Sequence, residues 1–162
     1  MARDLWSEDN SYFMGRSKRS WLWNILIVVT IIVCLVAFVA HYKNWTKVSA
    51  KDIQILSGAY YRQIQFADLD SVLLVEKIPP MERLNGFSAM AKEKGLFREF
   101  KDSLTDKKVY VYLDNFDQQK IKIVYKDSLK LFLNLSDSLE TDQLYRFLLD
   151  KKDATTALSI KK

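Results

Sequence analysis

A run of twenty apolar residues, Trp21 to Ala40, constrains this 162-residue chain more than any other feature. It contains no charged residue, and Asn24 is its only strongly polar side chain. As a helix rising about 1.5 Å per residue, the run is ~30 Å long, which matches the hydrocarbon thickness of a bilayer. The sequence therefore predicts a single transmembrane helix over residues 21–42.

Two other interpretations of this run fit less well. A signal-peptide core has only about 7–15 residues and ends at a small-residue cleavage site, whereas Phe38 lies three residues before a cut after Ala40. A buried core helix carries a polar stripe at the helical period, and this run has none. Aromatic and basic residues at both ends are typical of membrane interfaces. The predicted interface residues are Arg16, Lys18, Arg19, Trp21, Trp23, Tyr42 and Trp45.

Charges beside the span bear on its orientation. Three basic residues lie within the five positions before it, and three lysines follow it at wider spacing. The positive-inside rule then favours a cytoplasmic N-terminus and an extracytoplasmic C-terminal part. Because the difference is small, the reverse orientation stays open.

The basic net charge of +5 lies outside the part of the chain that can fold as a domain. Residues 46–150 carry 16 Lys+Arg and 16 Asp+Glu, so the excess belongs to the flanks. A nucleic-acid-binding domain would gather basic residues in the domain itself, so we expect no nucleic-acid partner. The segments that we expect are an N-terminal tail at 1–20, disordered or lying on the headgroups, one domain at 47–150 and a disordered tail at 151–162.

Short runs of β-branched and aromatic residues predict strands in the domain. Asn85-Gly86 and Lys94-Gly95 are predicted turns, and the three alternating runs from Val109 to Leu135 are predicted to form an antiparallel meander. An amphipathic helix follows, capped by Asp137 or by Ser136. The predicted strands are 59–66, 71–78, 109–113, 120–123 and 129–135, with shorter segments at 87–89 and 96–100.

Residues of this region resemble those of bacterial pleckstrin-homology-like (PH-like) domains, which are often attached to membrane helices. The matching pieces are Tyr61-Arg62-Gln63-Ile64, Phe66-x-Asp68-Leu69-x-x-Val72, Arg83-x-Asn85-Gly86-Phe87, Gly95-x-Phe97, Lys108-x-Tyr110-x-Tyr112, Leu133-Asn134-x-Ser136-Asp137 and Thr141-x-x-Leu144-Tyr145. The resemblance implies a mainly β (α+β) fold, a curled sandwich or barrel of about seven strands with a C-terminal helix. Such a fold is a binding scaffold, and it does not fix the ligand. No loop carries the basic cluster that phosphoinositide binding would need.

Candidate catalytic chemistry is sparse. His41 is the only histidine and lies at the membrane edge, where an interface anchor is expected, so a Ser-His-Asp triad or a histidine-rich metal site cannot form elsewhere. No nucleotide or zinc motif occurs. We therefore expect no cofactor and no metal. Asp68 and Asp70 form the best carboxylate pair for a hydrolase, but aspartates at a strand end more often form turns.

The segment from Arg83 to Phe100 is the predicted partner-binding region, because it mixes apolar and charged residues around two glycines. Its candidate residues are Arg83, Asn85, Phe87, Met90 and Phe97. We predict a single-pass, membrane-anchored binding or scaffold domain that recognises a protein or an envelope component and is not an enzyme. The alternatives are a membrane-tethered hydrolase and a structural spacer within an envelope complex. Oligomeric state stays open.

Overall fold

The computed structural model describes residues 13–100 and 107–160, and the chain divides into two compact units, Met1–Val39 and Ala40–Lys162. Helix α1 (Phe13–Tyr42) makes up the first unit and continues to the start of the second. Its segment Trp21–Tyr42 is long and apolar enough to cross a membrane, and none of its most apolar window is buried. These properties are compatible with the predicted span.

Helix α1 begins before the predicted span. Residues 13–20 are helical, although the sequence leads us to expect a tail there, and residues 1–12 lie outside the described part of the chain. Within the apolar segment, the Thr30 hydroxyl donates to the Leu26 carbonyl at 2.8 Å. This bond satisfies the Thr30 hydroxyl within the helix, as a polar group in an apolar segment requires.

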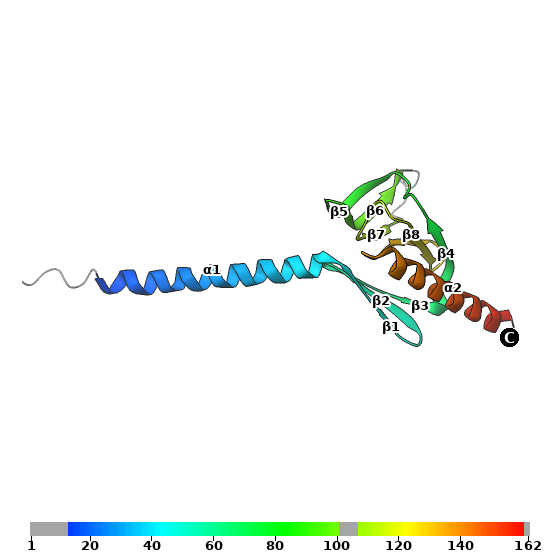
Figure 1. Ribbon diagram of the computed structural model, residues 1–162, viewed down its shortest axis with the longest axis horizontal. Helices are drawn as coiled ribbons and strands as arrows, with labels where there is room; N and C mark the ends of the chain where they lie inside the picture. Colours follow the sequence, from blue (N-terminus) through cyan, green and yellow to red (C-terminus); the bar gives the residue numbers. More distant parts are fainter. Residues whose placement is uncertain (1–12, 101–106, 161–162) are drawn as a thin grey trace, which may run out of the picture. The chain divides into compact units, whose positions relative to one another are not determined.

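The second unit is mainly β, as predicted, and contains two sheets and a C-terminal helix (Figure 1). The three-stranded antiparallel sheet consists of β1 (Asn44–Val48), β2 (Asp52–Ser57) and β3 (Tyr60–Gln65). The 3₁₀ turn η1 (Phe66–Asp68) leads into the six-stranded sheet, whose order is β4-β8-β9-β7-β6-β5. Its strands are β4 (Leu69–Val75), β5 (Met81–Ala89), β6 (Lys92–Glu99), β7 (Val109–Leu113), β8 (Lys120–Tyr125) and β9 (Leu129–Leu133).

The predicted antiparallel meander is wrong. Strands β8 and β9 form a hairpin, but β7 pairs with β9, in parallel, and does not pair with β8. Asn134, directly after β9, accepts from the backbone N–H of Asp114 at 2.8 Å through Oδ1. This bond ties the end of β9 to the end of β7, so β9 occupies the place that a meander would give to β8.

The two predicted glycine turns are also wrong. Asn85-Gly86 and Lys94-Gly95 lie inside β5 and β6, and the chain turns at Met90, whose φ is +55°. Gly86 lies opposite Gly95 across the hairpin. A Cβ on Gly95 would be 2.2 Å from the Asn85 carbonyl oxygen. The glycines therefore permit a close approach of two strands where the sequence suggests turns.

This close approach predicts that Gly95→Ala is strongly destabilising. The clash is with backbone, which cannot rotate away, and overpacking of this kind costs about 1–3 kcal/mol. Urea unfolding of the full chain in detergent micelles measures the loss, and Ser88→Ala, at an exposed site of the same hairpin, is the control. Equal stability of Gly95→Ala and the parent would contradict the interpretation.

Both faces of β7 are buried, although its alternation predicts one face toward water. Tyr110 and Tyr112 belong to the main core cluster with residues of both sheets, and Leu144 and Leu148 of helix α2 (Ser138–Ile160) also belong to it. Val109 and Val111 face the other way into a second cluster with Phe97 and Phe132. Ile78 and Met81 pack on that second cluster and cover it. The outer face of β7 is therefore apolar because it is buried too.

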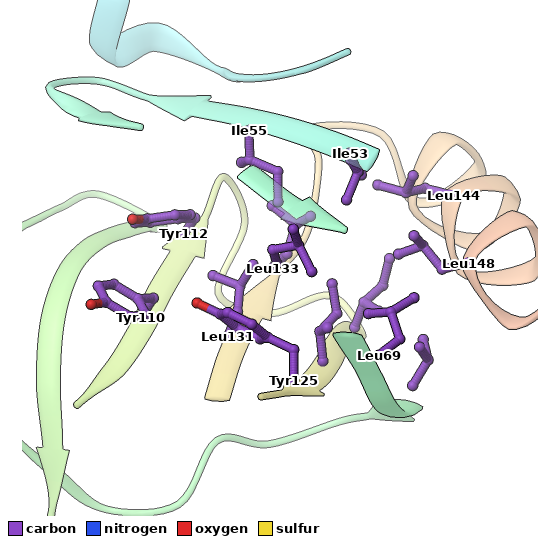
Figure 2. Packing of buried hydrophobic residues seen from close by; sticks show 14 of the residues in the cluster. Ile53, Ile55, Leu69, Tyr110, Tyr112, Tyr125, Leu131, Leu133, Leu144 and Leu148 are labelled. Carbon is purple, nitrogen blue, oxygen red and sulfur yellow. The ribbon is translucent and has the colours of Figure 1, made fainter. Parts of the chain in front are cut away.

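The main core has an apolar end and a hydroxyl-bearing end (Figure 2). Leu144 and Leu148 lie at the end next to α2, whereas the hydroxyl groups of Tyr110, Tyr112 and Tyr125 all point away from that helix (Figure 2). All three tyrosines are buried. Burial raises the pKa of Tyr112 to about 12 and raises that of Tyr125, because the phenolate form is poorly solvated there.

These shifts predict a loss of stability in alkali. Above pH 10.0, the usual pKa of tyrosine, the unfolded chain gives up the Tyr112 proton first, so the folded state binds more protons up to about pH 12. Stability therefore falls as pH rises through this window, by at most about 1.4 kcal/mol per pH unit for one group. Tyr112→Phe should reduce the slope of unfolding free energy against pH, whereas the exposed Tyr61→Phe should not. Equal slopes in the two variants would contradict this.

Helix α2 begins as predicted and ends later. Asp137 caps it, because its Oδ1 accepts from the Leu139 N–H at 2.9 Å. The helix then continues to Ile160, through most of the segment 151–162 for which the sequence suggests a disordered tail. No glycine or proline occurs between Asp150 and Ile160, so nothing in the sequence stops it.

Candidate functional site

The five residues predicted to bind a partner lie on the β5–β6 hairpin but not on one surface. A register shift between Arg83 and Asn85 marks a β-bulge. Arg83 is opposite Phe97, which faces the second cluster, while Asn85 is opposite Leu96, which faces the main core. The bulge therefore turns Arg83 and Asn85 to opposite faces of the sheet.

Most of these side chains have partners within the domain. Phe97 is 3% exposed and belongs to the second cluster. The Phe87 ring lies 5.3 Å from the His41 ring, edge to face, and the Asn85 Oδ1 accepts from the Tyr60 hydroxyl at 3.3 Å. Only Met90, at the tip of the hairpin, is fully exposed. The hairpin supplies an exposed tip and not a continuous binding surface.

The predicted membrane-interface residues lie on two elements. Arg16, Lys18, Arg19, Trp21, Trp23 and Tyr42 are in α1, and Trp45 is in β1. Trp21 and Trp23 are exposed, as is Tyr42, whose ring has the Lys92 ammonium 5.0 Å from its centre. Trp45 is half-exposed under the Lys43 ammonium, 4.3 Å from the ring centre.

Asp68 and Asp70 both hold the turn between β8 and β9. The Asp70 Oδ2 accepts from the Asp127 N–H at 2.8 Å. Asp68 accepts from the Lys126 N–H through its carbonyl at 3.1 Å, and its carboxylate lies 3.8 Å from the Lys126 ammonium. The contacts fit turn-forming aspartates.

A different feature is the outer edge of β1, whose backbone hydrogen-bonding groups pair with no other strand of the described residues. The β1–β2 register is regular, and the Ser49 N–H donates to the Asp52 carbonyl at the turn. Pairs in an antiparallel ladder alternate between bonded and non-bonded, so Lys47 bonds to β2 while Thr46 and Val48 direct their N–H and C=O outward. Asn44 confirms the alternation, since its N–H bonds outward to the Asp114 Oδ2 at 2.6 Å.

This edge borders a groove of about 590 Å³ between β1 and the N-terminal half of α2. Trp45 and Val48 give it apolar surface from the strand, and both are more than 40% exposed. Phe147 does the same from the helix, where Asp137 and Glu140 add two carboxylates. The remaining lining residues are Lys43, Asn44, Thr46, Asp114, Leu135, Ser136, Gln143 and Leu144.

The edge of β5 is less suited to pairing with another chain. Its bulge at Arg83 to Asn85 interrupts the alternation of outward groups, and Gly86 has φ of +137°. Bulges of this kind protect sheet edges against pairing. The register of β1 contains no such shift, so β1 is the better template for an added strand.

A buried polar network holds β1 in place at the end of the groove. The Asn44 Nδ2 donates to the carbonyls of Tyr112 at 2.7 Å and Asn134 at 2.8 Å, and its Oδ1 accepts from the Ser57 hydroxyl. Next to it, the Lys94 ammonium lies 2.9 Å from the Asp114 Oδ1, and both side chains are fully buried. Burial lowers the pKa of Lys94, against the opposing effect of the Asp114 carboxylate.

Lys94 and a second lysine of β6, Lys92, bind the last carbonyls of α1. The Lys94 ammonium donates to the His41 carbonyl at 3.2 Å, and the Lys92 ammonium donates to the Tyr42 carbonyl. Carbonyls at a helix end lack partners within the helix and favour cations. The chain that leaves the apolar helix is thus fixed to β6 at its first residues.

Among residues 13–100 and 107–160, no group of three His, Cys, Asp or Glu side chains could hold a metal ion. Comparisons with models of protein families, with curated proteins and with solved structures found no match. Sequence reasoning missed the β1 groove because it assigned no strand to residues 44–57, although Trp45, Thr46 and Val48 favour strands.

Proposed function

We propose that this chain is a membrane-anchored protein-binding domain, and that it captures an extended segment of another protein by strand addition to β1. One observation carries the proposal, the free edge of β1 beside the groove that α2 borders. In strand addition, backbone hydrogen bonds supply affinity and the neighbouring pockets select side chains.

The groove favours a particular kind of segment. Outward N–H and C=O groups at Thr46 and Val48 require a partner with its own free backbone groups, which means an extended peptide. Apolar surface at Trp45 and Phe147 suits apolar side chains. The groove has two carboxylates, those of Asp137 and Glu140, against one ammonium, that of Lys43. The segment therefore carries a basic side chain where it faces the start of α2.

The segment Trp21–Tyr42 serves as the anchor in this proposal. Its length, composition and exposure support a bilayer span, and its last carbonyls are bound by Lys92 and Lys94 of the domain. The basic residues before it favour an extracytoplasmic domain. Two sheets followed by a C-terminal helix also support the PH-like resemblance, which itself favours binding over catalysis.

Site-specific photo-crosslinking in intact membranes tests the proposal. A photoreactive residue at Gln143, which lines the groove, should cross-link to one discrete protein, whereas one at Arg146, exposed on the same helix outside the groove lining, should not. Excess peptide with the cross-linked sequence should suppress the product. Equal cross-linking at the two positions, or a product that is only a second copy of this chain, would contradict it.

A further inference from the structure

Arg62 points into the space between the two sheets. Strand β3 alternates, with Tyr61, Gln63 and Gln65 exposed and Ile64 buried in the main core. Arg62 lies two residues before Ile64 and therefore shares its inward side. Its side chain is only half-buried, so solvent still reaches it.

Tyrosines surround the inward-facing guanidinium. Its central carbon lies 3.8 Å from the ring centre of Tyr110, a cation–π contact, and its charge also acts on Tyr112 and Tyr125. Tyr60, on the same side of β3, stacks on Tyr112 with ring centres 6.0 Å apart. Tyr110, Tyr112 and Tyr125 are the residues of the hydroxyl-bearing end of the core, where their phenol groups point away from α2 (Figure 2).

No carboxylate of residues 13–100 and 107–160 balances the charge of Arg62. It forms no ion pair with a carboxylate of the described residues, and its Nε is buried without a hydrogen-bond partner. Tyr112 and Tyr125 cannot act as counter-ions, because burial raises the pKa of each and keeps them protonated. Arg98 is different: its Nε is also buried and unpaired, but its guanidinium is neutralised by Glu82 at 2.7 Å.

We propose that Arg62 and the tyrosine hydroxyls beside it bind an oxyanion, the carboxylate or phosphate group of a small ligand. A partly buried cation without a carboxylate partner is costly, and the Arg62 Nε–H, which has no hydrogen-bond partner, can donate to an oxygen of such an anion. Protonated phenols donate further hydrogen bonds to such oxygens. This site shares no residue with the lining of the β1 groove, so it is independent of the proposed peptide binding.

NMR spectroscopy of the ¹⁵N-labelled full chain in detergent micelles observes the Arg62 Nε–H group directly. The Arg62 Nε–H resonance, assigned by its absence in Arg62→Lys, is followed while sodium phosphate is added, with sodium chloride at equal ionic strength as reference. We expect a saturable shift with a dissociation constant on the order of 1 mM or tighter, and no comparable effect of chloride. The Arg98 Nε–H resonance should stay unchanged.

The outcomes separate the ligand classes. Saturation with phosphate but not with acetate assigns a phosphate site, the reverse assigns a carboxylate site, and saturation with both assigns a general oxyanion site. Backbone amide resonances that shift with the Arg62 Nε–H in the parent chain should no longer shift in Arg62→Lys, whose spectrum also shows whether the fold is kept. A shift that does not saturate with either anion, or one that Arg98 shares, would overturn the proposal.

Discussion

Replacing Lys94 by methionine is expected to destabilise the folded chain by about 3–5 kcal/mol, because it leaves the Asp114 carboxylate buried without its cation. The Lys94 Nζ and the Asp114 Oδ1 are 2.9 Å apart with no solvent access. After the change, Asp114 keeps, among donors of the described residues, those on its other oxygen, the Asn44 N–H and the Ser136 hydroxyl. Urea unfolding of the full chain in detergent micelles measures the loss.

Two further variants identify the cause. Lys92→Met, on the same face of β6, removes an ammonium that binds the Tyr42 carbonyl but pairs with no carboxylate of the part that the structure describes. It should therefore cost about 1 kcal/mol or less. Lys94→Met combined with Asp114→Asn removes both charges and should recover part of the stability lost in Lys94→Met alone. A Lys94→Met chain as stable as Lys92→Met would contradict the assigned role of the pair.

Local signals were sufficient for several elements of this fold. The apolar run from Trp21 forms a helix as predicted, the Asp137 side chain caps α2 as its position suggests, and Lys126-Asp127 forms the β8–β9 turn. In each case the residues that determine the structure are neighbours in the sequence. Hydrophobic period and turn chemistry act at this short range.

Pairing between distant segments could not be predicted in the same way. Gly86 and Gly95 suggest turns until their strands are placed opposite each other, and the parallel β7–β9 pair depends on Asn134 reaching the end of β7. Lys94 looks like a surface residue in a charged sequence, but the fold surrounds it. The groove could not be predicted for the same reason, because β1 is known to be an edge strand only once the pairing of the other strands is known.

Thr46→Pro is expected to reduce partner capture by at least about tenfold, which corresponds to ~1.4 kcal/mol, while leaving the domain folded. The Thr46 N–H points away from β2, so a proline there removes no bond of the β1–β2 ladder. It does remove one donor from the free edge, and its ring occupies the place of an added strand. Cross-linking yield from Gln143 measures capture, and urea unfolding measures the fold.

The alternation of β1 supplies matched controls. Lys47→Pro changes the next residue, whose N–H bonds to β2 at Gln54, and should therefore destabilise the domain itself. Thr46→Val keeps the backbone N–H and removes only the hydroxyl, so capture should persist. If Thr46→Val weakened capture as much as Thr46→Pro, the partner would recognise the side chain and not the strand edge. The contrast between neighbouring prolines depends only on which way each N–H points, so it tests strand addition whatever the sequence of the captured segment.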